Sequence, residues 1–519
     1  MLNETENRIL APNETPVLAV VARNSLANLA KMAALSVTVF LLPPILVRVL
    51  DKPTYATWML ILQIGTYVAL FDGSIQSAIS RFVARSRGLK DDLYMGQMLS
   101  SAGLIMLFAG FLTVILTILG AWQLDRLFPG IPPSIGTDAQ QALLIFGMSL
   151  ALSIPFSTLA GAFLGLQMNQ VNAVAGSVGK ILGAAGAAWA AYHHQGLVAM
   201  AVWTAAGNLL QGLLYLLAWK QLRLTGFLHL AHVTRTALKE FVSFCYAIFA
   251  TQSSAILITG LDIPIVAAFD FHSAAYYAIA ATISTMLSVP QGAVVTTLIP
   301  VASGMSALET PQRLGQLVLK TTRYSTAILC LLALPLFLGM SPFLRLWVGS
   351  DYAIHAFPIA ILLVIAQFIR LTLLPYAAFV FATGQQHRML ISPLGEGVVN
   401  LGCSLVGAHF LGATGVALGT LIGACAGVLL HAFNSMPRTD SMSFKRSSLV
   451  LTGILKPIFC CLPTVILALT LINNVPSLIV QIMMICSGEL LTVFALWKLN
   501  FDARERNEIV GLVLHLAHA

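Results

Sequence analysis

The sequence predicts an all-α polytopic membrane protein of about 14 transmembrane helices. Of its 519 residues, 58% are hydrophobic and only 9% are charged, whereas soluble domains carry roughly 25% charged residues. Apolar stretches of roughly 20 residues, long enough to cross a bilayer, recur along the whole chain. This composition excludes a soluble enzyme, and the polar, acidic start of the chain argues against a cleaved signal peptide.

The apolar stretches and the basic residues between them define the expected topology. The spans are expected at residues 25–50, 54–76, 98–122, 141–163, 172–193, 197–219, 241–269, 273–304, 321–341, 357–383, 389–410, 414–436, 449–472 and 477–498. With the N-terminus inside, 20 of the 28 Lys and Arg residues fall in cytoplasmic segments, four in outer segments and four within spans. This positive-inside bias places both termini in the cytoplasm, and the basic loops need no nucleic acid to explain them.

Spans 1–6 and 7–12 read as two copies of one unit, offset by 219 residues. Asp51 then corresponds to Asp270, and Gly165 to Gly384. Each copy has an even number of spans, so both begin on the same side and the repeat is parallel, as in other two-lobed carriers. The expected parts are a cytoplasmic tail (1–24), an N-lobe (25–220), a cytoplasmic linker (221–240), a C-lobe (241–436), an accessory helix pair (449–498) and a cytoplasmic tail (499–519).

Several motifs between residues 22 and 435 resemble those of Wzx-type polysaccharide flippases. They are Asp51-Lys-Pro-Thr-Tyr-Ala-Thr-Trp-Met-Leu, Leu70-Phe-Asp-Gly-Ser, Ser80-Arg-Phe-Val-Ala, Ala275-Tyr-Tyr-Ala-Ile-Ala, Leu298-Ile-Pro-Val-Ala-Ser and Phe343-Leu-Arg-Leu-Trp-Val-Gly-Ser-Asp-Tyr. These flippases belong to the superfamily of multidrug, oligosaccharidyl-lipid and polysaccharide exporters. The resemblance implies a twelve-helix, two-lobed core, often with two extra helices. It also implies that the protein moves undecaprenyl-diphosphate-linked oligosaccharide from the cytoplasmic to the periplasmic leaflet of the bacterial inner membrane.

The expected function is therefore a flippase for O-antigen, capsule or exopolysaccharide synthesis. Its expected partners are the lipid-linked oligosaccharide and membrane lipids, with the polymerase and chain-length proteins of the same pathway as further candidates. A drug/cation antiporter of the same fold, a lipid II flippase and a membrane sugar polymerase or ligase remain alternatives. The short outer loops argue against the polymerase. The sequence contains no GxxxxGK[ST] motif and no metal-ligand cysteine spacing, so we expect neither an enzyme nor a cofactor or metal.

Ionisable residues within spans are costly in lipid and are therefore candidates for function. Arg370 lies near the midpoint of span 10, and its guanidinium can form two hydrogen bonds to a diphosphate. Lys31 and Lys180 would add positive charge for substrate binding. Alternatively, Arg370 bonds helix carbonyls or an acid on another helix, and Lys31 extends back to the headgroups. Lys456 and Glu489 are expected to pair within the accessory hairpin.

Two acids are candidates for gating or ion coupling. The 219-residue offset places Lys180 on Val399, one turn from Glu396. Lys180 and Glu396 would then form an ion pair that opens and closes during transport, or each would bind within its own lobe. Asp262 lies two residues before Pro264, and a carboxylate beside a broken helix is a plausible cation or proton site. The alternative is that Asp262 caps the helix that follows.

Overall fold

The structure is a computed structural model that describes residues 38–222, 232–306, 310–471, 478–503, 505–507 and 510. These residues form helices and connecting turns, and none of them lies in a strand. Nine of the helical stretches within these ranges are long and apolar enough to cross a membrane. Each of the expected spans contains a described helix, so the predicted all-α polytopic membrane fold is confirmed.

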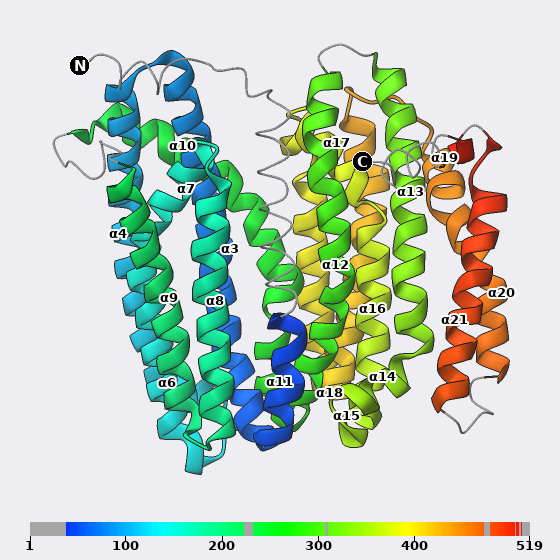
Figure 1. Cartoon of the computed structure of the whole chain (residues 1–519), viewed down its shortest axis with the longest axis horizontal. Coiled ribbons are helices and arrows are strands. Elements are labelled where there is room, and N and C mark those ends of the chain that lie inside the picture. Colours follow the sequence, from blue (N-terminus) through cyan, green and yellow to red (C-terminus); the bar gives the residue numbers. More distant parts are fainter. Residues whose placement is uncertain are drawn as a thin grey trace. The chain divides into compact units, whose positions relative to one another are not determined.

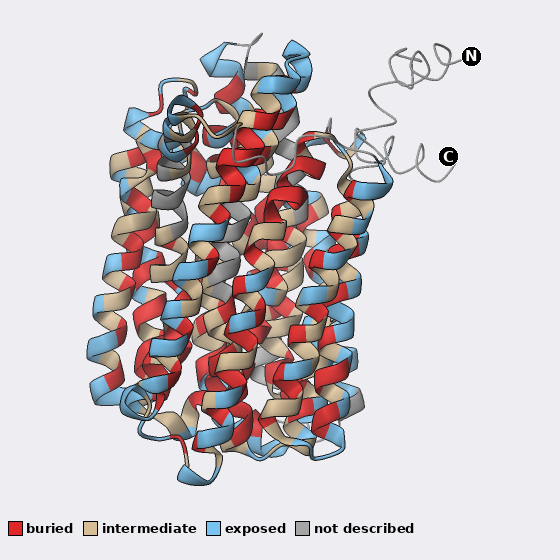
Figure 2. Cartoon of the chain, turned by 90° about the vertical axis from the view of Figure 1, so that its left-hand side faces the viewer, coloured by how far each residue is buried: buried red, intermediate tan, exposed pale blue. Residues whose placement is uncertain are grey.

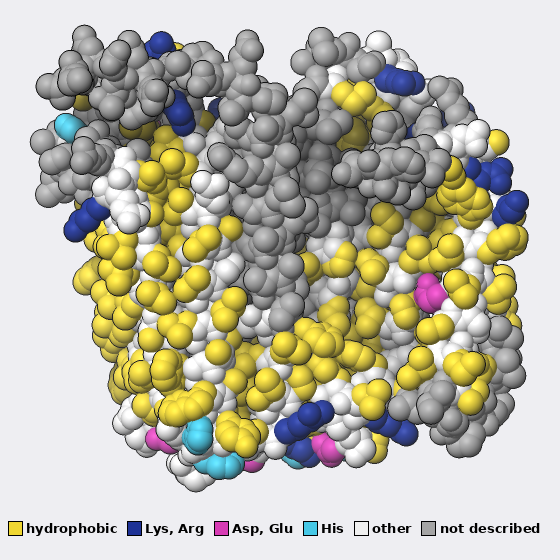
Figure 3. All heavy atoms as spheres, viewed as in Figure 1, with side chains coloured by type: hydrophobic (Ala, Val, Ile, Leu, Met, Phe, Trp, Pro, Cys, Tyr) yellow, Lys and Arg dark blue, Asp and Glu magenta, His cyan; other side chains and the backbone are white. Residues whose placement is uncertain are grey.

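The outward faces of the helices are apolar, as a lipid environment requires. Helix α4 (Asp92–Trp122) exposes a run of large side chains that includes Phe108, Phe111 and Leu116, with Phe108 67% exposed. In Figure 3, hydrophobic side chains cover the middle of the helices, and the charged and histidine side chains gather mostly near the helix ends. Figure 2 shows that exposed and buried residues alternate along single helices. Soluble monomers rarely expose so much contiguous apolar surface, so these faces contact lipid.

The chain forms two compact units. Figure 1 gives the labels of the helices that make them up. Unit 1 comprises residues 1–49, 64–125 and 133–249, and unit 2 comprises residues 50–63, 126–132 and 250–519. The division falls within α3 (Lys52–Leu89), α5 (Leu124–Leu127) and α10 (Arg235–Ala255). The predicted boundaries of the lobes, the linker and the accessory helix pair stay predictions.

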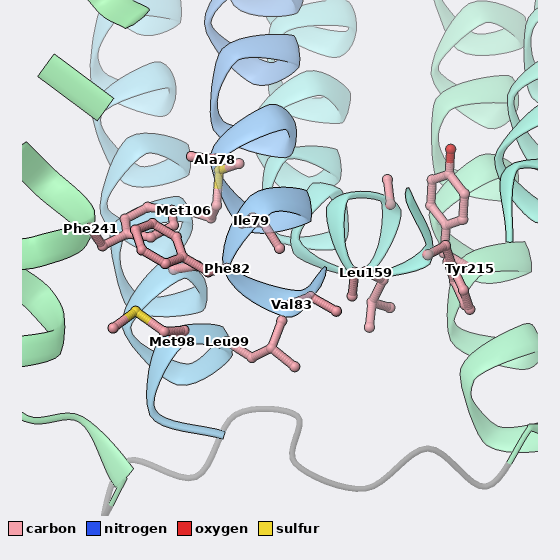
Figure 4. Close-up of a cluster of buried hydrophobic side chains, with 14 of the residues drawn as sticks. Ala78, Ile79, Phe82, Val83, Met98, Leu99, Met106, Leu159, Tyr215 and Phe241 are labelled. Atoms are coloured by element: carbon pink, nitrogen blue, oxygen red, sulfur yellow. The ribbon is translucent and has the colours of Figure 1, made fainter. Parts of the chain in front are cut away.

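Unit 1 contains most of the first half of the chain. Its elements are the helix Thr38–Val49, the second part of α3, α4, α6 (Pro133–Ser153), a 3₁₀ turn (Ile154–Phe156), α7 (Ser157–Gly165), α8 (Asn169–Tyr192), α9 (Gly196–Gln221) and the first part of α10. Its core gathers Phe82, Met98, Leu159 and Phe241 from four of these helices (Figure 4). Helices α8 and α9 pack through small residues, and a Cβ on Gly179 would lie 2.6 Å from the Gly207 carbonyl oxygen. Small residues allow this close approach in a membrane.

Apart from α5, which is divided between the units, unit 2 contains the remaining elements. They are the first part of α3, the end of α10, a π-helical turn (Ile256–Gly260), α11 (Asp262–Phe269), α12 (Phe271–Ser306), α13 (Pro311–Leu338), α14 (Met340–Trp347), α15 (Ser350–His355), α16 (Phe357–Leu371), α17 (Leu374–Ala382), a 3₁₀ turn (Gln386–Met389), α18 (Ile391–Leu430), a π-helical turn (His431–Ser435), a 3₁₀ turn (Met436–Arg438), α19 (Arg446–Ser448), a π-helical turn (Leu449–Leu455), α20 (Lys456–Leu471), α21 (Leu478–Ala495) and a π-helical turn (Leu496–Asn500). Helix α18 contains spans 11 and 12. A break at Gly412, where φ is 56°, separates the two spans.

The turns that follow α7 and α17 align the two halves of the chain with an offset that differs from the predicted 219 residues. After α7 ends at Gly165, the left-handed residue is Gln167, with φ of 60°. After α17 ends at Ala382, the left-handed residue is Gly384, with φ of 72°. Gly384 therefore matches Gln167 in the turn, whereas the 219-residue offset matched Gly384 with Gly165. A shift of two residues is needed here.

The repeat residue Asp270 has a structural role at the Gly412 break. Its Oδ2 accepts a hydrogen bond of 3.3 Å from the Ala413 N–H, which begins the second half of α18. We expect Asp270→Ala to lower the free energy of unfolding by about 1 kcal/mol, because it removes the partner of a free N–H group at a helix start. Thermal unfolding in detergent measures this change. The exposed Asp138 provides the control: an equal loss for Asp138→Ala would contradict a specific cap at Asp270.

Candidate functional site

Two membrane spans are broken within unit 2, where they carry charged residues. Span 10 consists of α16, which ends at Leu371, and α17, which begins at Leu374 with Pro375 in its first turn. Span 7 contains the π-helical turn Ile256–Gly260, after which α11 begins at Asp262. Arg370 lies in the last turn of α16, and Asp262 lies in the first turn of α11. Each charge therefore lies at the helix end whose dipole favours it.

Arg370 is the centre of a hydrogen-bond network between α12, α16 and α18. Its Nε lies 2.6 Å from Glu396 Oε1, and its Nη1 donates to Gln367 Oε1 at 2.9 Å. Gln367 donates in turn to Ser288 Oγ on α12 at 2.6 Å. Arg370 Nη2 is buried and has no hydrogen-bond partner. The guanidinium is thus held on one side by a carboxylate and keeps one donor for another group.

Glu396 belongs to a polar stripe along α18. Ser392, Glu396, Asn400 and Ser404 are four residues apart, so they share one helix face, and all four are buried. Asn400 donates to the carbonyl of Ile258 in the π-helical turn, and Ser404 donates to Asn400 Oδ1 at 3.0 Å. The stripe thereby supplies partners to a backbone segment that lacks regular helical bonds.

Two further side chains complete the surroundings of the broken span 7. Gln63 Nε2 donates to the Gly260 carbonyl at 2.9 Å. Gly427 makes room for the acid on α18, because a Cβ at this position would collide with the Glu396 carboxylate. A larger residue at Gly427 would therefore displace the partner of Arg370.

Asp262 is buried and hydrogen-bonded through its side chain. Its Oδ2 accepts from the Tyr277 hydroxyl at 3.0 Å and from Thr420 Oγ1 at 3.2 Å. The residue before α11 is Leu261, and it makes no side-chain cap bond. The predicted alternative, that Asp262 caps the helix after the kink, is therefore wrong. Instead, the carboxylate joins α11 to α12 and α18.

Arg370 is within electrostatic range of Asp262 and Tyr277 as well as bonded to Glu396. One cation thus faces two carboxylates inside unit 2. When both acids are ionised, this group carries a net negative charge, which a proton or a monovalent cation would balance. In the part of the chain that the structure describes, no group of three His, Cys, Asp or Glu residues is placed to hold a metal ion.

Unit 1 has a similar helix break without charge. Span 4 passes from α6 through the 3₁₀ turn Ile154–Phe156 into α7, with Pro155 in the turn. The side chains near this break are polar but neutral: Ser149 Oγ accepts from Asn208 at 3.1 Å, and Ser153 donates to the Ser149 carbonyl at 2.6 Å. Among the described residues, the two breaks in unit 2 bring an arginine together with two acids, whereas the hydrogen bond from Asn208 to Ser149 at the break in span 4 joins neutral side chains.

The structure places three of the five predicted site residues together: Arg370, Glu396 and Asp262. Glu396 pairs with Arg370, so a pair between Glu396 and Lys180 would require Arg370 to change partner; that exchange stays a prediction. Lys180 lies on α8 with an exposed side chain. Lys31 lies outside the described residues. The predicted roles of all five residues in binding and coupling stay predictions.

The expected ion pair in the accessory hairpin is wrong. Lys456 Nζ donates to the Asn500 carbonyl at 3.3 Å. Glu489 Oε1 is buried without a hydrogen-bond partner. Equal depth on neighbouring helices was not sufficient, because the two side chains have to face each other as well.

The sequence interpretation missed Ser288, Tyr277, Thr420 and Asn400 as parts of this site. One signal was available, because Asn400 and Ser404 continue the four-residue spacing of Ser392 and Glu396 in an otherwise apolar helix. Tyr277 and Thr420 offered no such signal, because neither continues that run of polar residues at four-residue spacing and the direction of each side chain depends on how its helix is rotated in the packed structure.

Comparisons with known proteins identify the fold. No protein-family model and no curated protein matches the sequence. The structure is similar to that of lipid II flippase MurJ in an inward closed conformation, with a TM-score of 0.68 and 16% identity over 91% of this chain and 99% of the other. It is also similar to an inward-facing multidrug resistance MATE transporter of the MOP superfamily, with a TM-score of 0.61 and 16% identity over 80% and 98% of the two chains. The Vibrio cholerae MATE transporter VcmN gives a TM-score of 0.55 and 15% identity over 79% and 94%.

These likenesses support a common architecture for this chain, a lipid flippase and drug transporters. The MurJ likeness extends over a larger share of this chain than either MATE likeness does. The chain therefore has the multi-pass membrane fold found in lipid II flippase MurJ and in MATE transporters.

Proposed function

We propose that this protein is a flippase that moves undecaprenyl-diphosphate-linked oligosaccharide from the cytoplasmic to the outer leaflet of the bacterial inner membrane. The polymer would be an O-antigen, a capsule or an exopolysaccharide. The observation that carries this proposal is Arg370: a guanidinium within a membrane span, beside a helix break, with one buried donor and no partner for it. A diphosphate is an anion that such a donor binds well.

Pairing between Arg370 and Glu396 suggests how binding and release would be linked. While Glu396 is ionised, it neutralises Arg370 at 2.6 Å. Protonation of Glu396 would release the guanidinium, which could then donate two hydrogen bonds to two oxygens of the diphosphate. Asp262 would hold the coupling proton or cation, with Tyr277 and Thr420 as its hydrogen-bond donors.

The distribution of Lys and Arg supports the orientation in the membrane that this proposal uses. With both termini in the cytoplasm, the connection that contains α15 faces the periplasm. The end of α3 near Arg85 then faces the cytoplasm. Lipid-linked substrate would enter at the Arg85 end and leave at the α15 end.

A lipid II flippase is the second candidate, and the MurJ likeness over 91% of this chain favours it. A drug/cation antiporter is less well supported, because the MATE likenesses cover 79–81% of this chain. The buried Arg370 donor without a partner favours an anionic substrate. A drug antiporter would be expected to present net negative charge to a cationic drug, and the two acids near Arg370 would supply such charge when both are ionised.

Purified protein in liposomes separates these candidates. We expect accelerated movement of undecaprenyl-diphosphate oligosaccharide to the outer leaflet, detected by a glycosidase added outside. Protein-free vesicles give the background rate. A second set of vesicles contains lipid II in place of this substrate. A third set is loaded with a cationic dye, whose export is followed. Movement of lipid II alone would identify the second candidate, and dye export without lipid movement would overturn the flippase proposal.

A further inference from the structure

Helix α3 carries a charged cluster at each end. It contains 38 residues, which at 1.5 Å per residue span roughly 57 Å, more than the thickness of a bilayer core. Lys52 opens the helix, and Arg85 lies in its last two turns. Each of these residues forms an ion pair with an acid far away in the sequence.

The first cluster holds the start of α3 against α12 and α15 in unit 2. Lys52 Nζ lies 2.9 Å from Asp351 Oδ2 on α15. The Tyr276 hydroxyl on α12 donates to the same oxygen at 3.0 Å, and Lys52 lies 5.3 Å from the Tyr276 ring centroid. His355 stacks on Tyr276 with the ring centroids 4.8 Å apart. We call Lys52, Asp351 and Tyr276 the outer cluster.

Charge is favoured within the outer cluster. Burial alone would raise the pKa of Asp351, but the hydrogen bonds from Lys52 and Tyr276 outweigh it and hold this pKa below its usual value. Hydrogen bonds to Tyr276 and Asp351 raise the pKa of Lys52 in turn. The acid and the amine are therefore both ionised at neutral pH.

The second cluster joins the other end of α3 to α4 and α10 in unit 1. Arg85 Nη1 lies 3.2 Å from Glu240 Oε1 on α10. The Tyr94 hydroxyl on α4 donates to the same oxygen at 3.1 Å, and the Arg85 guanidinium lies 5.7 Å from the Tyr94 ring centroid. Arg85, Glu240 and Tyr94 form the inner cluster. Both clusters thus have the same composition: a cation, an acid and a tyrosine that bonds the acid and lies under the cation.

The clusters hold α3 and α10, two of the helices that are divided between the two units. Residues 50–63, at the start of α3, belong to unit 2, and the rest of α3 belongs to unit 1. Residues 235–249, at the start of α10, belong to unit 1, and the rest of that span belongs to unit 2. Each cluster therefore holds the beginning of a helix whose remaining residues belong to the other unit.

We propose that the two clusters are the two closures of the transport path: the outer cluster closes it toward the periplasm and the inner cluster closes it toward the cytoplasm. This inference rests on the proposed transport function and adds the residues that control access. Each closure opens when the beginning of one shared helix leaves its cluster. With both clusters formed, the path is closed at both ends.

The strength of the clusters fits this role. The Lys52 and Asp351 side chains are 38% and 48% exposed, and those of Arg85 and Glu240 are 59% and 40% exposed. Exposed ion pairs are weak, so removal of one partner should change the ratio of closed to open molecules by about fivefold or less. A closure that opens once in every transport cycle has to be held by weak interactions. An ion pair with a purely structural role gains nothing from a weak interaction.

Distances between spin labels test the closures without any substrate. In a background without native cysteines, one pair of labels at Asp51 and Ile354 reports on the outer end. A second pair at Leu89 and Thr236 reports on the inner end. None of the four labelled residues belongs to either cluster, and all four are exposed. Thr236 lies four residues before Glu240 in the sequence. Pulsed electron resonance then gives the distance distribution of each pair.

We expect Lys52→Ala to add a longer distance at the outer pair and none at the inner pair. Glu240→Ala should do the reverse. Lys52→Asp combined with Asp351→Lys should restore the original outer distribution, and Tyr276→Phe should give a smaller shift by removing one hydroxyl. Arg345→Ala is the control, since Arg345 is an exposed cation in the same outer connection. Unchanged distributions in the folded Lys52→Ala, Tyr276→Phe and Glu240→Ala variants would overturn the proposal.

The same labels distinguish a failed closure from a failed transport function. If the distances shift as expected but no lipid moves in liposomes, the closures stand and the proposed substrate is wrong. If lipid moves normally while a reversible cross-link between cysteines at positions 52 and 351 holds the outer cluster, the outer closure is wrong and the flippase stands.

Discussion

Replacing Arg370 by Ala is expected to abolish lipid transport and to lower the free energy of unfolding by about 3–5 kcal/mol. The change leaves Glu396 as an uncompensated charge in a buried position, and breaking a buried pair by removing one partner has a cost of this size. Glu396 is 5% exposed, so water cannot replace the lost partner readily. Thermal unfolding in detergent and lipid translocation in liposomes measure the two effects.

Two variants separate the stability of the pair from its function. Replacing both Arg370 and Glu396 by Leu should recover most of the stability, because well-packed apolar side chains can substitute for a buried ion pair. Transport should remain absent, since the diphosphate then lacks its donor. Arg370→Lys should restore transport only in part, because an ammonium keeps the charge without the planar arrangement of donors.

An exposed pair provides the matched control for these measurements. Arg388 pairs with Asp440, whose side chain is 74% exposed. Arg388→Ala should lower the free energy of unfolding by no more than about 1 kcal/mol. Normal lipid transport by Arg370→Ala at equal protein abundance would remove Arg370 from the substrate site. Transport by the Leu/Leu variant would show that the pair has a structural role only.

The membrane fold was predictable because it depends on composition and segment length. Fourteen apolar stretches predicted the spans, and each of them contains a helix among the described residues. The breaks within spans 7 and 10 were less predictable. Proline residues marked both spans, yet the π-helical turn at Ile256–Gly260 depends on Asn400 and Gln63, which bond carbonyls far away in the sequence.

The candidate site was predictable residue by residue but not as a network. The cost of charge in lipid singled out Arg370, Glu396 and Asp262. The partner of Glu396 was not predictable in the same way, because partner choice depends on helix rotation. The repeat suggested Lys180, while Arg370, 26 residues before Glu396, is the residue 2.6 Å away. The same limit explains the wrong pairing of Lys456 with Glu489.

Coupling to an ion gradient should depend on Asp262, and Asp262→Asn is expected to reduce gradient-driven lipid accumulation to the rate seen without a gradient. Asparagine has nearly the same volume, and its amide oxygen can still accept from Tyr277 and Thr420. The fold should therefore persist while the negative charge is lost. Imposing a proton gradient and a sodium gradient separately across the liposome membrane identifies the coupling ion.

The neighbours of Asp262 provide graded controls. Tyr277→Phe and Thr420→Val each remove one hydrogen bond to the carboxylate but leave its charge, so each should shift the ion concentration that gives half-maximal transport. Glu396→Gln should act differently, because it frees Arg370 permanently: the substrate should bind but release slowly, whichever gradient is applied. If Asp262→Asn still accumulates lipid in response to a gradient as wild type does, the coupling ion binds elsewhere. In that case Asp262 serves only to join α11 to α12 and α18.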